Sequence, residues 1–292
     1  MESSSLYNDR YLELLHKDIL TIMDEIDRIC KLRGLRYYLC AGTCLGALRH
    51  RGFIPWDDDL DIEMPYDDFK RFISTLEKDL SPSFYLEWVT ADENYHQDFA
   101  KICLKNTVFV EDGWDAKDSM GIFVDIFPLY PSTGYSKVIQ VKKKIYNFLH
   151  ASMFCRAQKK LDWKLHNWPV NIVSKLVNSQ TIYRMMIYVI HPLKESEALY
   201  YACYSSTYPI KRNITPIDWY RECLNVKFED RVYLCAIDSP KKMRLMYGEN
   251  YMELPPIHKR KTHYPLFVKF SDGSTCQFPK RKNKVTYKDV VE

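Results

Sequence analysis

The most constraining feature of the sequence is the stretch of residues 41–64, AGTCLGALRHRGFIPWDDDLDIEM, which places four aspartates within five positions between apolar neighbours. On a β-strand, residues two apart share one face, so Asp57, Asp59 and Asp61 point the same way if a strand runs through them. Like charges this close raise the pKa of one another's carboxylates unless a cation lies among them. Mg²⁺, or Mn²⁺ in its place, prefers carboxylate, water and phosphate oxygens. The stretch therefore predicts a metal site that holds a phosphate. Asp58 would point to the opposite face, so we expect it to be the poorest ligand and dispensable.

A further acid is expected to complete this site. Residues 121–127, GIFVDIF, put Asp125 in the middle of an apolar strand. A buried carboxylate there is costly unless it is paired or close to a metal. Beside the acidic strand, Asp125 would be either a metal ligand or the base that takes a proton from an acceptor hydroxyl. The competing interpretation of the acidic run is a solvated turn, which the alternation through Asp61 and the buried position of Asp125 disfavour.

Candidate substrate-binding residues flank the acids. Gly42 and Thr43 follow a short apolar run and precede a short helix. A glycine there allows close approach of the backbone, and exposed amides at a helix start suit a phosphate, although a tight turn explains the pair equally well. The other candidates are a basic pair after this turn, a lysine within a strand and a tryptophan beside the acids: Arg49, His50, Lys101 and Trp56. The alternative for these four is a structural or surface role.

The hydrophobic patterning predicts an α+β fold with a mixed sheet at its centre. Helices are expected over 6–33 and 44–50, from Pro65 onward, over much of 135–205, and from Ser239 to Gly248. Strands are expected over 37–41, 59–63, 84–89, 99–104, 107–111 and 121–127, the last ending at Pro128, with hairpins over 226–235 and 267–278. The core would span residues 1–130, a helical region 135–205 and a C-terminal part 206–264, followed by a basic tail over 265–292 with a hairpin.

Composition narrows the class of protein. The chain has 292 residues, of which 46% are hydrophobic, and a net charge of +4, which does not indicate a nucleic-acid binder. Nine cysteines, an odd number with no CxxC spacing, favour reduced thiols in a cytoplasmic protein over disulfides or a zinc site. The polar start MESSSLYNDR is unlike a signal peptide.

Residues 42–64, GTCLGALRHRGFIPWDDDLDIEM, resemble the signature of the LicD family, which includes the fukutin-related proteins. The likeness continues in the same order through FAKICLKNTVFVE, GIFVDIFPLY and RLMYGENYMELPPIHKRKTHYP, and touches most of residues 10–264. Cys44 and Tyr130 depart from the family pattern, since Leu or Ala is usual at the first position and an acid is common at the second. The resemblance implies one transferase domain over 1–264 with a nucleotidyltransferase-like fold. It also implies that Asp59 and Asp61 are the metal-binding pair, that Asp57 is the acid before them, and that Asp125 is the further carboxylate.

The activity that the resemblance implies is transfer of phosphocholine, or a related alcohol phosphate, from a CDP-activated donor to a sugar hydroxyl. The acceptor would be a cell-surface glycan or its lipid-linked precursor, such as teichoic acid, lipopolysaccharide or capsule. Two alternatives stay open: a nucleotidyltransferase that moves the nucleotide instead, and a non-catalytic glycan-binding relative. The enzyme would be cytoplasmic, and its basic tail would either contact the inner face of the membrane or simply be solvated.

Overall fold

The computed structural model describes residues 9–92, 95–111, 120–158, 168–256, 260 and 265–278. The helices are α1 (Asp9–Arg33), α2 (Ala41–His50), α3 (Tyr66–Asp79), α4 (Lys137–Gln158), α5 (Trp168–Leu176), α6 (Ser179–Ile190) and α7 (Ser239–Tyr247), with short 3₁₀ turns η3 (Glu195–Glu197), η4 (Ile210–Asn213) and η5 (Ile217–Tyr220). The strands are β1 (Tyr38–Leu39), β2 (Asp61–Pro65), β3 (Phe84–Glu87), β4 (Ala100–Leu104), β5 (Val108–Val110), β6 (Phe123–Ser132), β7 (Tyr200–Ala202), β8 (Ile214–Pro216), β9 (Cys223–Phe228), β10 (Arg231–Ala236), β11 (Phe267–Lys269) and β12 (Thr275–Gln277).

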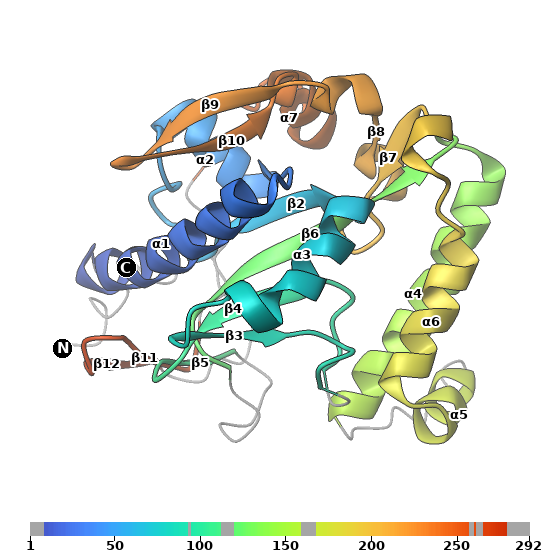
Figure 1. The fold of residues 1–292 in the computed structure, drawn as a ribbon, viewed down its shortest axis with the longest axis horizontal. Helices are drawn as coiled ribbons and strands as arrows, with labels where there is room; N and C mark the ends of the chain where they lie inside the picture. The colour runs from blue at the N-terminus through green and yellow to red at the C-terminus, as the bar shows by residue number, and fades with distance from the viewer. Residues whose placement is uncertain are drawn as a thin grey trace.

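A mixed sheet forms the centre of the molecule (Figure 1). Its main path runs β1-β2-β6-β4-β3, and the C-terminal half of β6 also pairs with β7, which pairs with β8. Strands β2 and β6 are parallel, while the other neighbouring strands are antiparallel. The predicted α+β class is confirmed. Because β2 and β6 lie side by side, the acidic stretch and the strand that carries Asp125 are neighbours in the sheet.

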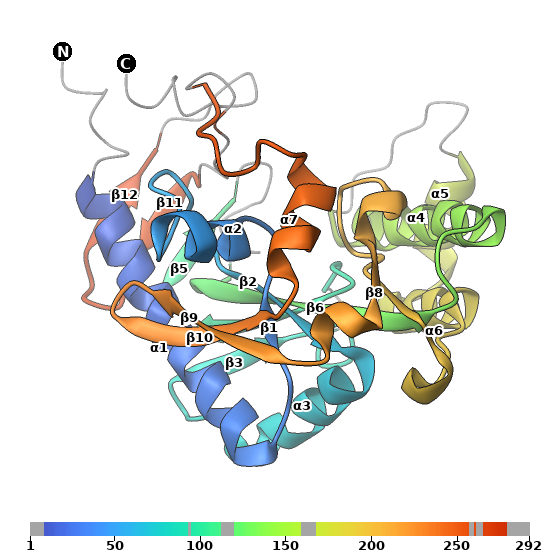
Figure 2. The same cartoon turned by 90° about the horizontal axis from the view of Figure 1, so that it is seen from above.

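The two faces of this sheet have different chemistry because strand side chains alternate. Ile62 and Ile126 are buried partners on β2 and β6, on the face against which α1 and α3 pack. Residues at three- and four-residue steps along α1, such as Ile19, Met23 and Ile26, are buried as the periodicity predicted. Fully burying such a side chain contributes about 1.5–3 kcal/mol. Figure 2 shows α1 and α3 on one side of the sheet and α2 and α7 on the other.

Strand β6 does not end at Pro128 as predicted, but continues to Ser132. Pro128 lacks a backbone N–H, so it is tolerated only where the ladder needs no donor. It lies between Ile126, which pairs with β4, and Tyr130, which pairs with β7. Pro128 therefore lies where β6 exchanges β4 for β7 as a partner, while β6 remains paired with β2 from Asp125 to Leu129.

The remaining predicted elements are largely confirmed. Helices α4, α5 and α6 pack together at one end of the sheet (Figure 1), and β9 and β10 form the first predicted hairpin. Strands β11 and β12 form the second, and β11 also pairs with β5. The nine cysteines all lie in the described part of the chain, and the structure holds them as thiols rather than as disulfides. None of the described helices is long and apolar enough to cross a membrane.

Candidate active site

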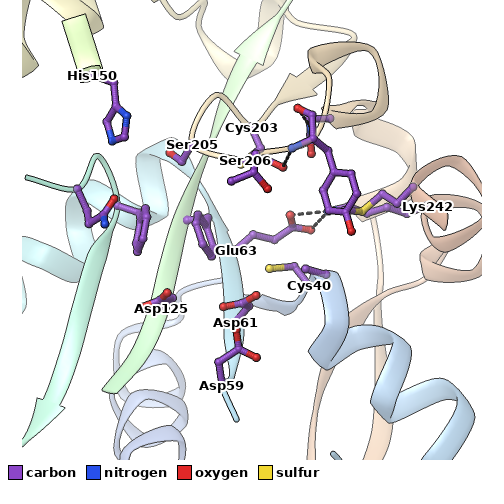
Figure 3. Close-up of a pocket in the computed structure, with 18 residues that line it drawn as sticks. Cys40, Asp59, Asp61, Glu63, Asp125, His150, Cys203, Ser205, Ser206 and Lys242 are labelled. Carbon is purple, nitrogen blue, oxygen red and sulfur yellow. Dashed lines mark hydrogen bonds and ion pairs between the residues drawn. The ribbon is translucent and has the colours of Figure 1, made fainter. Parts of the chain in front are cut away.

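A cavity of about 340 Å³ lies on the face of the sheet opposite α1 and α3. Three of the predicted acids, Asp59, Asp61 and Asp125, line it together (Figure 3). Asp61 and Asp125 are direct register partners across the parallel β2–β6 pair. The register of these two strands therefore brings together carboxylates that are far apart in the sequence.

A row of charged side chains crosses three strands on this face. Lys101 of β4 and Asp125 of β6 are register partners, and Asp61 follows on β2. The Lys101 Nζ lies 2.6 Å from Asp125 Oδ1 and 3.3 Å from the centroid of the Phe123 ring. Burial raises the pKa of Asp125 to about 6, because the desolvation of its carboxylate outweighs the attraction of Lys101, and Asp59 adds repulsion. Lys101 does not line the cavity itself, but its ion pair with Asp125 fixes the position of a carboxylate that does.

The neighbouring row contains a second buried ion pair. Glu63 of β2 lies beside Phe127 of β6, whose ring is 4.5 Å from that of Phe99. The Glu63 carboxylate bonds to Lys242 of α7, and Lys242 Nζ also donates to the Tyr220 hydroxyl at 3.0 Å. Glu63 and Lys242 both line the cavity (Figure 3).

Sequence reasoning missed this second pair. Glu63 continues the two-residue alternation of Asp59 and Asp61, which was a usable signal. Lys242 had none, because it is separated from Glu63 by well over a hundred residues and follows another lysine on an ordinary helix.

The acidic turn corrects the prediction for Asp58. Strand β2 begins only at Asp61, and the Asp57 amide donates to the Ile54 carbonyl in a turn. The alternation of a strand therefore does not apply to residues 57–59. One carboxylate oxygen each of Asp57, Asp58 and Asp59 lies within 4.8 Å of the others, so the expectation that Asp58 points away is wrong. Of the described acids that line the cavity, Asp59 is the one that also belongs to the group of Asp57, Asp58 and Asp59.

These carboxylates fit a hard divalent cation by the chemistry of their donor atoms. Cations of this kind take several carboxylate oxygens and keep water or phosphate oxygens at the remaining positions. Among the described residues, the carboxylates of Asp57, Asp58 and Asp59 form such a ligand set, and Asp59 also lines the cavity with Asp61 and Asp125. These groups are all oxygen donors, which suits Mg²⁺ or Mn²⁺ better than zinc.

The predicted phosphate turn is part of a helix. Helix α2 begins at Ala41, so Gly42 and Thr43 lie in its first turn rather than before it. The Thr43 hydroxyl accepts a hydrogen bond from the Asp61 backbone amide at 2.9 Å and thereby fixes the start of β2. A Cβ at Gly42 would lie 2.9 Å from Asp57 Oδ2, so the missing side chain lets this carboxylate approach the positive end of the helix.

The other predicted substrate-binding residues have identifiable structural partners. Arg49 Nη1 donates to the carbonyls of Tyr251 and Glu253, each at 3.0 Å. His50 Nδ1 lies 3.4 Å from Arg49 Nε, and burial lowers the pKa of His50. Trp56 is buried, and the Arg260 guanidinium lies 4.1 Å from its ring centroid. Arg49, His50 and Trp56 are not among the described residues that line the cavity.

The wall opposite the acids contains residues that the sequence did not single out. His150 of α4 and the loop after β7, including Ser205 and Ser206, line the cavity (Figure 3). Neither segment carries a motif around these residues, and His150 is one histidine within a helix of mixed composition. The packing of the helical region against the end of the sheet is what brings them to the site.

The fold and the cavity define an α+β protein with a carboxylate-lined cavity on one face of its central sheet. Residues 34–166 match the family model described as LicD/FKTN/FKRP, nucleotidyltransferase domain. The chain is 27% identical over 255 residues to the lipopolysaccharide cholinephosphotransferase LicD of Haemophilus influenzae, an alignment that covers 84% of this chain and 92% of that protein. The family model and this relative confirm the predicted resemblance to the LicD family, which the model places over residues 34–166.

Two further relatives match short segments. Uncharacterised proteins of Rickettsia typhi and Rickettsia prowazekii are each 40% identical, over 55 and 47 residues respectively. These alignments cover 19% and 16% of this chain and 18% of each relative.

Proposed function

We propose that this protein transfers phosphocholine, or a related alcohol phosphate, from a CDP-activated donor to a sugar hydroxyl of a cell-surface glycan. The observation that carries the proposal is the convergence of Asp59, Asp61 and Asp125 on one cavity. It is supported by similarity along most of the chain to a lipopolysaccharide cholinephosphotransferase. Lipopolysaccharide, teichoic acid and capsule precursors are acceptors of the class that we propose.

Asp57, Asp59, Asp61 and Asp125 would hold Mg²⁺ or Mn²⁺, with Asp58 as an added candidate. When bound, the cation supplies positive charge for the oxygens of the donor diphosphate and for the departing CMP.

The chain's own residues hold this acidic wall in place. Lys101 fixes one oxygen of Asp125, and Thr43 fixes the start of β2. The rings of Phe99 and Phe127 cover part of the cavity wall and keep water from it, which strengthens electrostatic interactions inside.

The chemistry of the two substrates favours a cytoplasmic site of action. A CDP-activated alcohol is a soluble nucleotide, and lipid-linked glycan precursors lie at the inner face of the membrane. The net charge of +4 would add a weak attraction to anionic lipid that salt screens. We therefore propose a cytoplasmic enzyme with peripheral membrane contact.

The test is the variant Asp59→Asn, assayed for CMP release and for phosphocholine transfer from CDP-choline to lipopolysaccharide with Mg²⁺. We expect transfer to fall about 1,000-fold, because a carboxylate that neutralises developing charge in a buried site is removed. Asp67→Asn is the matched control, since Asp67 is exposed on α3 and forms an ion pair with Lys70 of the same helix. Its rate should equal that of the wild type.

Other products would point to other functions. Pyrophosphate release from CTP and phosphocholine, without CMP release from CDP-choline, would indicate a nucleotidyltransferase. Binding of CDP-choline without turnover on lipopolysaccharide or teichoic acid would indicate a non-catalytic relative. Transfer by Asp59→Asn at the wild-type rate would contradict the proposed role of the acids.

A further inference from the structure

A second cavity, of about 360 Å³, adjoins the acidic one. His150 and residues 205–208 line both cavities, so these residues form a shared wall. The Ser205 hydroxyl lies 3.5 Å from the Asp98 carbonyl, which ties this loop to the segment before β4. A molecule in the second cavity would therefore meet a donor in the first cavity across His150.

The lining of the second cavity suits a polyol. It combines carboxylate, ammonium, amide and hydroxyl groups with three tyrosine rings: Asp98, Lys143, Asn147, Ser206, Tyr146, Tyr204 and Tyr208. Hydroxyl and amide groups of this kind exchange hydrogen bonds with sugar hydroxyls, and aromatic rings cover the apolar faces of sugars. The acidic cavity differs, because it carries the carboxylates of Asp59, Asp61 and Asp125.

His150 is supported by a buried carboxylate. The Asp98 side chain is buried, and one of its oxygens accepts the Tyr146 hydroxyl. Its other oxygen lies 3.9 Å from His150 Nε2. Within the described part of the chain, this Nε2 is buried and has no hydrogen-bond partner. A small rotation of the ring would close the gap, as is common for catalytic hydrogen bonds that tighten only with substrate bound.

The alternative base, Asp125, is less free to act. Its Oδ1 is held by Lys101 at 2.6 Å, and the two residues are register partners in the sheet. A proton taken by Asp125 would weaken this buried ion pair. A proton taken by His150 would instead create an ion pair with Asp98, whose carboxylate lies 3.9 Å from His150 Nε2, and an opposite charge nearby favours the charged imidazolium.

We propose that the second cavity receives the sugar acceptor and that His150, oriented by Asp98, takes the proton from the attacking hydroxyl. This inference rests on the proposed function. The acceptor oxygen forms a bond to the phosphorus of the alcohol phosphate, the bond from that phosphorus to the bridging oxygen breaks, and CMP leaves with the bonding electrons. The hydroxyl proton moves to the ring nitrogen of His150 that faces away from Asp98, and then to solvent.

The test uses the full-length protein with CDP-choline, Mg²⁺ and lipopolysaccharide, and compares His150→Gln with the wild type across pH. We expect kcat for transfer to fall about 100-fold or more, the usual contribution of a general base. The rise of the wild-type rate with pH should be absent from the variant, while affinity for CDP-choline should not change.

Titratable or charged groups also surround His150, on its own helix, in the segment before β4, in the loop after β7 and in the acidic cavity: Lys143, Tyr146, His96, Asp98, Tyr204, Tyr208, Asp59, Asp61 and Asp125.

Two further variants separate catalysis from folding. Imidazole added to His150→Ala should restore part of the rate, which a folding defect would not allow. Asp98→Asn should lower kcat without changing the affinity for CDP-choline, because the His150 ring loses the carboxylate 3.9 Å from its Nε2 that orients it. His191→Asn, at the exposed end of α6, is the matched histidine control and should behave like the wild type.

Three results would overturn the inference. The first is a His150→Gln enzyme that keeps at least a third of the wild-type kcat, and the second is an unchanged pH limb in that variant. The third is a wild-type protein that does not turn over CDP-choline at all, because then the proposed function fails and this inference fails with it. The first two results leave the proposed function intact, so the two failures can be told apart.

Discussion

Two buried lysine–carboxylate pairs lie on the same face of the same sheet, and they are built differently. Lys101 and Asp125 come from adjacent strands and meet through register. Glu63 lies on β2, but Lys242 reaches it from α7, far along the chain. The first pair follows from strand pairing alone, whereas the second requires the C-terminal part of the chain to pack over the sheet. The comparison shows that one wall of the cavity is built by neighbouring strands of the sheet, whereas the other forms only when helix α7 packs over the sheet.

The largest expected effect concerns the tertiary pair. Lys242→Met would leave the Glu63 carboxylate buried without its cation, and we expect the free energy of unfolding to fall by about 3–5 kcal/mol. Denaturant unfolding monitored by circular dichroism measures this change. Adding Glu63→Leu should recover most of the loss, because the pair is then replaced by apolar groups of similar size. A loss below about 1 kcal/mol for the single variant would mean that water reaches the pair.

A smaller effect is expected at the acidic turn, where the correction for Asp58 matters. Its oxygen lies with those of Asp57 and Asp59, so Asp58→Asn should weaken Mg²⁺ or Mn²⁺ binding by about 10- to 100-fold. Calorimetric titration with each metal measures this, and Asp67→Asn is the control. Unchanged affinity in Asp58→Asn would restore the sequence-based view that this residue is dispensable.

The smallest effect is expected one residue away from the tertiary pair. Lys241 pairs with Asp238 at 2.9 Å on the surface of α7, with 57% of its side chain exposed. Lys241→Met should change the free energy of unfolding by less than about 0.5 kcal/mol, because water screens an exposed pair. The same denaturant experiment compares it with Lys242→Met, and equal losses would show that α7 itself, rather than the buried charge, sets the stability.

The elements that could be predicted share one property: the sequence pattern that indicates each of them lies within the element itself. Helix α1 and helix α3 follow from periodic apolar residues, and the hairpins follow from turn residues between apolar runs. The errors arose where a neighbour overrode the local rule. Pro128 stays within β6 because the strand changes partners there, and residues 57–59 form a turn although their alternation resembles a strand.

The sequence by itself determined the acidic half of this site, since Asp59, Asp61 and Asp125 stand out by charge among apolar neighbours. The tertiary structure alone decided the other half, which consists of the Glu63–Lys242 pair, the shared wall at His150 and the second cavity. The physical reason is that strand alternation and charge act over a few residues, whereas Lys242 and His150 reach the site only when distant helices pack against the sheet.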